Sequence, residues 1–549
     1  MKERVMLALL VFALTFPSLA MSRAVGESCA VDHPVFVGVF REGAPRNMNY
    51  INKYVEQAGK KPAMIMWYQD WAQAFPVAAA QSVIDAGAIP HIVWEPWYWG
   101  DNNKIKLADI INGKWDSYIT TWAKDIKKFG KMVFLRPAHE FNIEGYPWGI
   151  VNNDKSPETY IKAFRHIVDI FKREKVTNVK WIWCFMNFSF PDEPWNNWEK
   201  CYPGNDYVDW IGIDGYNWGT TQNWSDWQEL KYMFRDQVRQ CKKLWPSKPI
   251  MIAEFACAEK GGDKAAWIKQ LPGYLKSSLR DVDALLWFDE KKETDWRINS
   301  SSRVLAAYAE IMKDPIFSSD GAALAEFTVT VKKVDRKSIP AVKANSPVKI
   351  DGDLKEWNNA VPIIMTDSSF IKEGLNWKGV EDLSGTAYLM WDSDNLYLAA
   401  NITDKIPLVN KQTNQNIWNG DGLEIVISAD PNADLERTSF SGKDYQIGFG
   451  TGDGKSNPAT VWSWQRHRSP TGSEIAVKKK GQPQGYYLEA KIPWDFFRGN
   501  FERKEGMKLG FDIAFDDADQ TTERERQMIW NGDYLFYKDP SVWGILELK

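Results

Sequence analysis

The feature that most constrains the fold is a series of eight short apolar runs between residues 34 and 314. Each run is rich in β-branched or aromatic residues and is too continuous for a half-exposed strand, which is typical of buried parallel strands. Longer amphipathic stretches, with the periodicity of helices, separate the runs. The runs cover residues 35–40, 64–67, 90–94, 132–136, 179–184, 208–214, 249–254 and 284–288.

Helix-start signals support the alternation of strands and helices. Ser156-Pro157-Glu158 places a cap, a first-turn proline and an acid ahead of a helix over residues 160–171, and Asp263 precedes another over 264–279. Further helices are expected over residues 227–244 and 302–312. Eight such units predict a (β/α)₈ TIM barrel, an α/β fold, over residues 30–315. No GxGxxG turn follows the first run, which argues against a dinucleotide-binding fold.

A second pattern begins after Lys313. Residues 316–345 have the composition of a linker that contains an extended segment at 327–334. Short alternating runs follow, separated by Gly, Asn and Asp, and they predict an all-β sandwich over residues 346–549. The expected strands are residues 386–391, 396–402, 422–428, 444–449, 486–492 and 509–515.

The first twenty residues predict export. Lys2 and Arg4 precede an apolar run at residues 5–16, and small residues follow at Ser18 and Ala20, which is the pattern of a secretory signal peptide over residues 1–20. We therefore expect a secreted protein, extracellular or periplasmic. We also expect it to be monomeric and to have no membrane insertion. Five cysteines are too few for a disulfide framework, although one bridge such as Cys201–Cys241 is compatible with export.

The charge balance gives no support to a nucleic-acid partner, whereas the tryptophan content indicates a carbohydrate partner. The net charge is −4, from 68 basic and 72 acidic residues, so nothing favours nucleic acid as a partner. The chain has 29 tryptophans in 549 residues, and indole rings stack on the apolar faces of sugars. A carbohydrate partner is therefore expected.

Catalytic groups of a barrel lie at the carboxyl ends of its strands. Most candidates at these positions are carboxylates, and no serine or cysteine has a partner histidine in the pattern. Paired carboxylates without a phosphate loop or metal cluster favour glycosidic bond cleavage, which needs one protonated and one ionised acid. The candidates are Asp70, Glu95, His139, Glu140, Asp214, Tyr216, Glu254, Trp287 and Asp289.

Two glutamates stand out among these candidates. Glu140 follows the fourth run and Glu254 ends the seventh. If the chain stays extended after Arg136, alternation puts Arg136 and Glu140 on one face, where the arginine would keep nearby carboxylates ionised. One such glutamate alone is equally consistent with a salt bridge, but two are harder to explain in that way. Trp94 and Trp97, around Glu95, form either a sugar-binding wall or a packed hydrophobic lid.

Residues 34–314 resemble glycoside hydrolase family 26, a clan A family of retaining (β/α)₈ enzymes that are mostly β-mannanases. The resemblance rests on three motifs, which are specific in combination. They are Arg136-Pro137-x-His139-Glu140-x-Asn142, the stretch from Asp206 to Asp214-x-Tyr216, and Ile252-Ala253-Glu254.

The resemblance implies a role for each matching residue. Glu140 would be the general acid/base, Glu254 the nucleophile, and no metal or other cofactor would take part. His139 would orient the acid and Tyr216 would contact the nucleophile, while packing inside the barrel is the alternative for Trp287. The implied substrate-binding residues are Arg136, His139, Asn142, Trp148, Tyr216 and Trp287, with Trp148 as an aromatic wall and Trp287 as an aromatic floor.

Residues 326–549 resemble a family 9 carbohydrate-binding module. The resemblance rests on Ile350-Asp351-Gly352-x-x-x-x-Trp357, Asp421-Gly422-Leu423-Glu424, and Glu489-Ala490-x-Ile492-Pro493-Trp494. It implies that Trp418 and Trp530 hold a terminal sugar between their rings, with core packing as the alternative for either. The acidic run at residues 516–519 is either a structural calcium site or a solvated loop.

Together these features predict a secreted retaining β-glycanase that hydrolyses internal β-linkages of a β-linked polysaccharide. β-1,4-Mannan is the first expected substrate. The loop Ile143-Glu144-Gly145-Tyr146-Pro147-Trp148-Gly149 lacks the tryptophan-rich run of typical mannanases, so mixed-linkage β-glucan or an exopolysaccharide is the alternative. A non-catalytic polysaccharide-binding protein is an alternative of another class.

Overall fold

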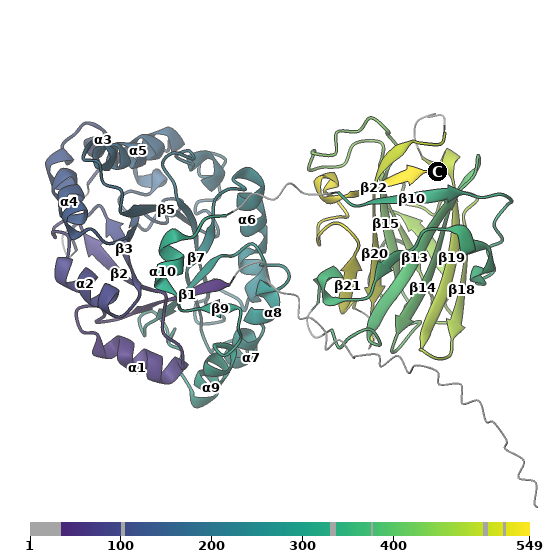
Figure 1. The fold of residues 1–549 in the computed structure, drawn as a ribbon, viewed down its shortest axis with the longest axis horizontal. Coiled ribbons are helices and arrows are strands. Elements are labelled where there is room, and N and C mark those ends of the chain that lie inside the picture. The colour runs from purple at the N-terminus through teal and green to yellow at the C-terminus, as the bar shows by residue number, and fades with distance from the viewer. Residues whose placement is uncertain (1–33, 100–104, 330–335, 375–376, 498–502, 520–522) are drawn as a thin grey trace, which may run out of the picture.

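The computed structural model describes residues 34–549 except 100–104, 330–335, 375–376, 498–502 and 520–522. The predicted signal peptide therefore lies outside the described residues. A barrel is followed along the chain by a β-sandwich, as predicted (Figure 1). Within the described ranges, no helix has both the length and the apolar character needed to span a membrane.

The first domain is a closed barrel of eight parallel strands. Each strand pairs with the next, and β1 closes the ring by pairing with both β2 and β8. All eight predicted runs are strands, because each is a continuous apolar segment that is buried between the barrel interior and the outer helices. The strands are β1 (Val35–Arg41), β2 (Met64–Asp70), β3 (Ile89–Glu95), β4 (Val133–Pro137), β5 (Val179–Met186), β6 (Trp210–Asn217), β7 (Ile250–Cys257) and β8 (Ala284–Asp289).

Helices surround this barrel (Figure 1). The helix predicted over residues 264–279 is two short helices, because Pro272 lacks an N–H group and sits in the first turn of the second one. The helices are α1 (Asn49–Ala58), α2 (Val77–Asp85), α3 (Leu107–Ile111), α4 (Asp116–Phe129), α5 (Pro157–Arg173), α6 (Leu230–Leu244), α7 (Lys264–Lys269), α8 (Leu271–Leu275), α9 (Ser302–Ile311) and α10 (Gly321–Glu326). The 3₁₀ turns of this domain are η1 (Ile150–Asn152) and η2 (Trp198–Cys201).

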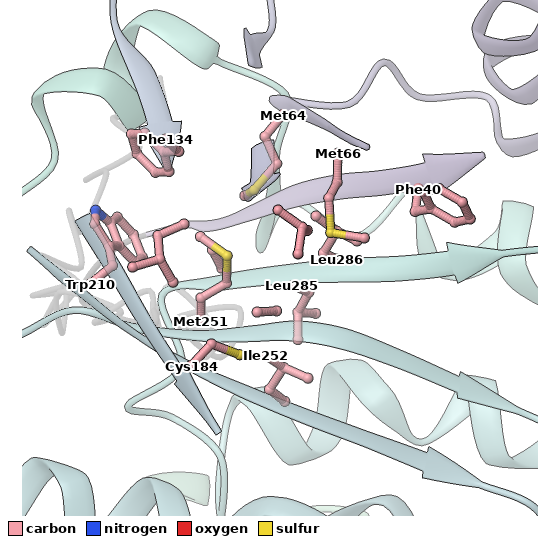
Figure 2. Packing of buried hydrophobic residues seen from close by; sticks show 14 of the residues in the cluster. Phe40, Met64, Met66, Phe134, Cys184, Trp210, Met251, Ile252, Leu285 and Leu286 are labelled. Atoms are coloured by element: carbon pink, nitrogen blue, oxygen red, sulfur yellow. The ribbon is translucent and has the colours of Figure 1, made fainter. Parts of the chain in front are cut away.

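The core of the barrel supports the site above it. Figure 2 shows some of the apolar side chains that fill it, among them Met66 from β2 and Cys184 from β5. The sulfur atoms of both residues contact the guanidinium of Arg136, at 3.2 Å and 3.4 Å. The guanidinium of Arg136 thus lies directly against the apolar core of the barrel. All four described cysteines are free and buried, so the Cys201–Cys241 bridge is not formed.

The second domain is a sandwich of mostly antiparallel strands. β10 pairs with both β13 and β22 and so joins the two sheets. All six predicted strands are present. The strands are β10 (Ser338–Lys343), β11 (Ile363–Met365), β12 (Ile371–Glu373), β13 (Leu383–Trp391), β14 (Asn395–Asp404), β15 (Gly422–Ser428), β16 (Asp444–Gly450), β17 (Thr460–Ser463), β18 (Glu474–Lys480), β19 (Gly485–Pro493), β20 (Lys508–Asp517), β21 (Arg526–Ile529) and β22 (Gly544–Leu548). The 3₁₀ turns are η3 (Leu354–Asn359), η4 (Ser368–Phe370), η5 (Asn414–Asn416), η6 (Trp494–Phe496) and η7 (Pro540–Val542).

The predicted linker at residues 316–345 is folded at both ends. The short strand β9 (Phe317–Ser318) pairs with β1, and α10 contacts β3, so this end belongs to the barrel. The other end is β10 of the sandwich. Part of the extended segment expected at residues 327–334 lies outside the described residues. The physical reason for the difference is that apolar residues such as Phe317 and Leu324 are buried against the barrel core.

Candidate active site

Three carboxylates converge at one end of the barrel. Glu140 follows β4, Asp214 lies in β6 and Glu254 lies in β7. One carboxylate oxygen of each lies within 4.8 Å of the other two, and all three side chains are buried. The predicted convergence of Glu140 and Glu254 is therefore confirmed.

The backbone that carries Glu140 does not continue the strand. Ala138 and Glu140 have φ angles of 49° and 48°, so the expected extended conformation after Arg136 is wrong. A non-glycine residue in this left-handed region costs about 1–2 kcal/mol. The Glu140 N–H donates to the carbonyl of Cys184 at 3.0 Å, and the Ala138 N–H donates to that of Trp94 at 3.2 Å. These bonds to the two neighbouring strands hold the turn in its strained conformation.

Arg136 organises the acidic side chains. Its Nη1 lies 3.0 Å from each carboxylate oxygen of Asp214, and its Nη2 donates to Glu254. Burial by itself would lower the pKa of Arg136, but the charges of Asp214 and Glu254 raise it well above its usual range. The side chain is fully buried. Arg136 therefore positions the carboxylates, as expected from its charge, and is not accessible to bind substrate directly.

Hydroxyl groups complete the surroundings of Glu254. The phenol of Tyr216 donates to Glu254 Oε2, and that of Tyr68, in β2, also bonds to Glu254. With Arg136, three donors face this carboxylate. The expected contact of Tyr216 with the predicted nucleophile is confirmed.

Glu140 has the environment of a protonated acid. Burial raises the pKa of its carboxyl well above the usual range, and the charges of Asp214 and Glu254 raise it further. It forms a hydrogen bond with Asp214, in which the protonated Glu140 is the donor. Because Arg136 compensates the charge of Asp214 directly, the proton resides on Glu140.

An aromatic cluster lies beside Glu140. His139 Nε2 and the Tyr146 hydroxyl are 3.3 Å apart, and Tyr146 stacks on Trp148 with 4.5 Å between ring centroids. Burial lowers the pKa of His139 well below its usual value, so its ring is neutral. Trp148 is fully buried and its Nε1 donates to the His139 carbonyl at 2.5 Å. It supports His139 and Tyr146 from behind, so its predicted role as a wall of the cleft is wrong.

The aromatics around Glu95 divide into two groups. Trp94 is buried under α4, where it stacks on Trp122 with 4.6 Å between centroids, so it cannot bind substrate. Trp97 and Trp99 instead donate their indole N–H groups to Glu95 Oε2, at 3.0 Å and 2.6 Å. Burial raises the pKa of Glu95 to about 7. Trp97 is partly exposed and Trp99 is 44% exposed, so they form an aromatic wall at the end of β3.

Two other predicted substrate-binding residues have structural roles. Trp287 is buried between β8 and α9, where its ring packs on Tyr308 with 5.2 Å between centroids. Asn142 is fully buried and bonds to the backbone of Met186, at the end of β5, and of Phe188, in the loop that follows. Trp287 is therefore not an aromatic floor, and Asn142 does not reach a substrate. In both cases the side chain is buried against neighbouring elements.

The remaining acidic candidates stabilise loops. Asp70 accepts hydrogen bonds from the side chain of Gln73 at 2.7 Å and from the Trp99 N–H at 2.8 Å. Asp289 accepts from the Ile298 N–H at 2.8 Å and pairs with Arg41 at 3.2 Å. Neither is part of the converging group.

Sequence reasoning missed three residues of the site, namely Tyr68, Tyr146 and Trp99. The first was detectable, because Tyr68 lies two residues after Met66 and so shares its inward face of β2. Tyr146 and Trp99 lie in loops, where no periodic pattern indicates which way a side chain points.

The sandwich carries a second candidate site. A cavity of about 670 Å³ is lined on this domain by Trp418, Trp464, Glu424, Gln446 and Arg524. Glu424 accepts hydrogen bonds from Gln446 and, at 3.2 Å, from Arg524. The Arg524 guanidinium also lies 5.1 Å from the centre of the Trp418 ring. Aromatic side chains with a few placed polar groups are the usual lining of a small-molecule site.

Trp530 is not part of this cavity. Its ring is buried in the sandwich core, 6.3 Å from that of Phe511. The prediction that it faces Trp418 across a sugar is therefore wrong, and core packing is the correct alternative. Trp464, which lines the cavity, was not predicted.

Two residues of the acidic run at 516–519, Asp517 and Asp519, form a largely buried cluster with Asp404. One oxygen each of Asp404, Asp517 and Asp519 lies within 4.8 Å of the other two. Arg526 bonds to Asp517 and Asp519 and so compensates part of the charge. The oxygen donors are those that calcium prefers, and the acidic side chains outnumber the single guanidinium, so the residues fit a hard cation.

Comparisons with known proteins find a family match in each domain. Residues 101–261 match the family Glycosyl hydrolase family 26, and residues 350–549 match Carbohydrate family 9 binding domain-like. The chain is 40% identical over 318 residues to Endoglucanase H of Acetivibrio thermocellus. The matched segment covers 56% of this chain and 33% of that protein. It is 31% identical over 171 residues to Mannan endo-1,4-beta-mannosidase A and B of Caldalkalibacillus mannanilyticus, with 30% of each chain covered.

The chain thus spans about a third of the length of these relatives. A solved family 9 carbohydrate-binding module from Caldicellulosiruptor kristjanssonii, in complex with cellotriose, is 22% identical with a TM-score of 0.28 and covers 39% of this chain and 94% of the module. Two family models thus match consecutive parts of the chain: glycosyl hydrolase family 26 matches within the barrel, and the family 9 carbohydrate-binding domain matches the sandwich.

Proposed function

We propose that the chain hydrolyses internal β-linkages of a β-glycan with retention of anomeric configuration. The observation that carries this proposal is the spacing of Glu140 and Glu254, which bring one oxygen each within 4.8 Å. Retaining enzymes need their two carboxyl groups about 5–5.5 Å apart, whereas inverting enzymes leave about 6.5–9.5 Å for a water molecule.

The two glutamates then divide the chemistry. Glu254, held by Arg136 and Tyr216, attacks the anomeric carbon, while Glu140 gives its proton to the departing glycosidic oxygen. The covalent ester that results removes the charge of Glu254. Because that charge had raised the pKa of Glu140, the pKa falls, and Glu140 can then take a proton from the water that hydrolyses the ester.

A β-glucan is the leading substrate in this proposal. The support is the 40% identity to an endoglucanase over 318 residues, together with a loop after Glu140 that lacks the tryptophan-rich run of typical mannanases. β-1,4-Mannan, the first expectation from sequence, is the second candidate, and the 31% identity to a mannanase supports it. Export to the periplasm or the medium remains a proposal that rests on residues 1–20.

A panel of barley β-glucan, cellulose, glucomannan and galactomannan, with product sizing, tests the reaction and the substrate together. We expect oligosaccharides from barley β-glucan, with the β-anomer as the first product detected by NMR. Glu254→Ala and Glu140→Ala should lose at least about 10³-fold in kcat on this substrate. Glu144→Ala, an exposed glutamate in the following loop, is the matched control and should be unaffected. A wild-type protein inert on every polysaccharide would contradict the proposal.

We further propose that the sandwich binds a sugar on Trp418. The exposed indole would stack on the sugar ring, and the polar groups of Glu424, Gln446 and Arg524 would meet its hydroxyls. Binding would hold the enzyme on its substrate and raise the local concentration of cleavable bonds. Calorimetric titration of the full chain with cellotriose and mannotriose, compared with Trp418→Ala, tests this proposal.

A further inference from the structure

Helix α6 of the barrel docks on the sandwich through charged side chains. Arg239 lies 3.0 Å from Asp533 and 2.7 Å from Asp539, and the hydroxyl of Tyr534 donates to Asp236 at 2.7 Å. The guanidinium of Arg235 sits over the Tyr534 ring at 3.6 Å. Arg239, Asp533 and Asp539 are partly to fully buried, so these contacts are less screened than open surface pairs. In Figure 1, α6 lies on the side of the barrel that faces the sandwich.

The cavity lined by Trp418 opens at this junction between the barrel and the sandwich. Besides the sandwich residues already described, its lining includes Lys231, Tyr232 and Arg235 from α6. Tyr232 is 59% exposed, and the ammonium of Lys231 lies 4.7 Å from the centre of its ring. The cavity therefore has an aromatic side chain and a hydrogen-bond donor on its barrel side as well as on its sandwich side.

A chain of ion pairs connects the two sides. Arg235 Nη1 lies 3.4 Å from one oxygen of Glu373, and Arg524 Nη2 lies 2.5 Å from the other. Arg524 in turn bonds to Glu424 at the base of the cavity. The arginine that lies over Trp418 is therefore oriented in part by a barrel residue, through one shared carboxylate.

The barrel side of the cavity belongs to the catalytic face. In a (β/α)₈ barrel each helix begins at the end where the preceding strand finishes, which is also the end that carries catalysis. β6, which bears Asp214 and Tyr216, precedes α6, and Lys231 and Tyr232 lie in the first turn of α6. The cavity thus opens on the rim of the face that holds the catalytic glutamates.

We propose that this cavity is a composite carbohydrate-binding site, in which a β-linked oligosaccharide held on Trp418 also contacts Tyr232 and Lys231 of the barrel. The inference rests on sugar binding by the sandwich, as proposed above. The phenol ring of Tyr232 packs on a C–H face of the sugar, and the Lys231 ammonium donates to a ring hydroxyl. The bound chain is thereby held at the rim of the catalytic face rather than on a remote surface.

Calorimetric titration of the full chain with cellotriose and mannotriose tests the composite site, in a Glu254→Ala background that prevents turnover. Trp418→Ala identifies which binding event belongs to the sandwich. We expect Tyr232→Ala to weaken that event about fivefold and Lys231→Ala about twofold, since each removes one contact. Tyr232→Phe, which keeps the ring, should bind within about 1.5-fold of the parent. The controls are Tyr50→Ala, another exposed tyrosine, and Lys243→Ala, at the opposite end of α6; both should leave binding unchanged.

The outcomes separate this inference from the one on which it depends. If Trp418→Ala abolishes the binding event but Tyr232→Ala and Lys231→Ala bind like the parent, the composite site is overturned and the sandwich site stands. If Trp418→Ala leaves every binding event intact, sugar binding by the sandwich itself fails. Weaker binding in Tyr232→Ala with unchanged unfolding temperature supports the composite site.

Discussion

The chemistry of single residues in the barrel depends on an imbalance of charge. Glu140, Asp214 and Glu254 share a buried space with one cation, Arg136. Three ionised carboxylates opposite one guanidinium would leave two uncompensated charges in a medium of low polarity, which is strongly unfavourable. If the three carboxyl groups together keep one proton, most of this unfavourable free energy is avoided. Glu140 holds it because Arg136 bonds directly to the other two.

This arrangement predicts how activity depends on pH. The acid must be protonated, so kcat/KM is lost as the pH rises through the pKa of Glu140, and because that pKa is raised, activity extends through neutral pH. Asp214→Asn removes one of the charges that raise the pKa, so we expect the alkaline limb to move to lower pH. The measurement is a pH profile of kcat/KM on soluble β-glucan. A limb that moved to higher pH would contradict the assignment of the proton to Glu140.

The hydroxyl of Tyr216 allows a second test of the same group. Tyr216→Phe removes one donor to Glu254 and leaves the ring in place. A hydrogen bond to a charged group contributes about 1.5–3 kcal/mol, so we expect kcat/KM to fall roughly 10- to 100-fold. Tyr50→Phe, at an exposed position on α1, is the control. An equal loss in both variants would indicate a general effect on the fold instead.

At the level of elements, the end of β3 carries a packed tryptophan and an exposed one only a few residues apart. Trp94 is still in the strand and points to α4, whereas Trp99 lies in the loop and is 44% exposed. We expect Trp94→Ala to lower the free energy of unfolding by about 3–5 kcal/mol, since it leaves a large cavity. Trp99→Ala should leave stability unchanged and raise KM several-fold at similar kcat. Chemical denaturation and steady-state kinetics on both variants measure the difference.

The acidic cluster between β14 and β20 makes a prediction about metal removal. Burial raises the pKa of Asp404 to about 6 and that of Asp517 to about 7, so the ionised forms are costly unless a cation is bound. We propose that calcium binds there. At pH 8, EDTA should lower the melting temperature of the sandwich by several degrees and added calcium should restore it.

Near pH 5 the calcium effect should be small, because protonated carboxyls no longer need the cation. Asp519→Asn should abolish the response to EDTA, while Asp394→Asn, an exposed aspartate in the same domain, should keep it. If EDTA has no effect at pH 8, Arg526 alone compensates the cluster.

For the whole molecule, the proposed functions of the two domains together predict how the rate depends on the form of the substrate. Trp418→Ala removes the proposed tether and leaves the catalytic glutamates untouched. We therefore expect the rate of hydrolysis of insoluble β-glucan to fall several-fold, while kcat/KM on short soluble oligosaccharides stays the same. The measurement is product release from both substrates at equal enzyme concentration. A parallel loss on both would mean that Trp418 influences the barrel itself.

Much of the architecture was predictable because it follows from local patterns. Continuous apolar runs, each followed by an amphipathic stretch, predict strands and helices, and the strand ends then locate Glu140 and Glu254. The pairing of β10 with both sheets of the sandwich was not predictable, since it depends on contacts between segments about two hundred residues apart in sequence. The same limit applied to the linker, whose apolar residues are buried on the barrel.

The roles of the tryptophans illustrate what sequence cannot determine. Trp94, Trp148, Trp287 and Trp530 all lie near functional motifs, yet each is buried in packing, whereas Trp99 and Trp464 face open space. An indole ring can pack in a hydrophobic core or stack on a sugar equally well. At a strand end or in a loop, no fixed periodicity indicates which way the tryptophan side chain points. The neighbours that decide the matter come from distant segments.

The two domains, the order of strands and helices in the barrel, and the two glutamates at one end of it could be inferred from the amino-acid sequence, because the period of apolar residues places the strand ends. The folded arrangement was needed to see which carboxyl holds the proton, which aromatic side chains are accessible, and that α6 forms one wall of the cavity on the sandwich. These properties depend on charges and surfaces brought together from distant segments, whose interaction falls off with distance in space and not along the chain.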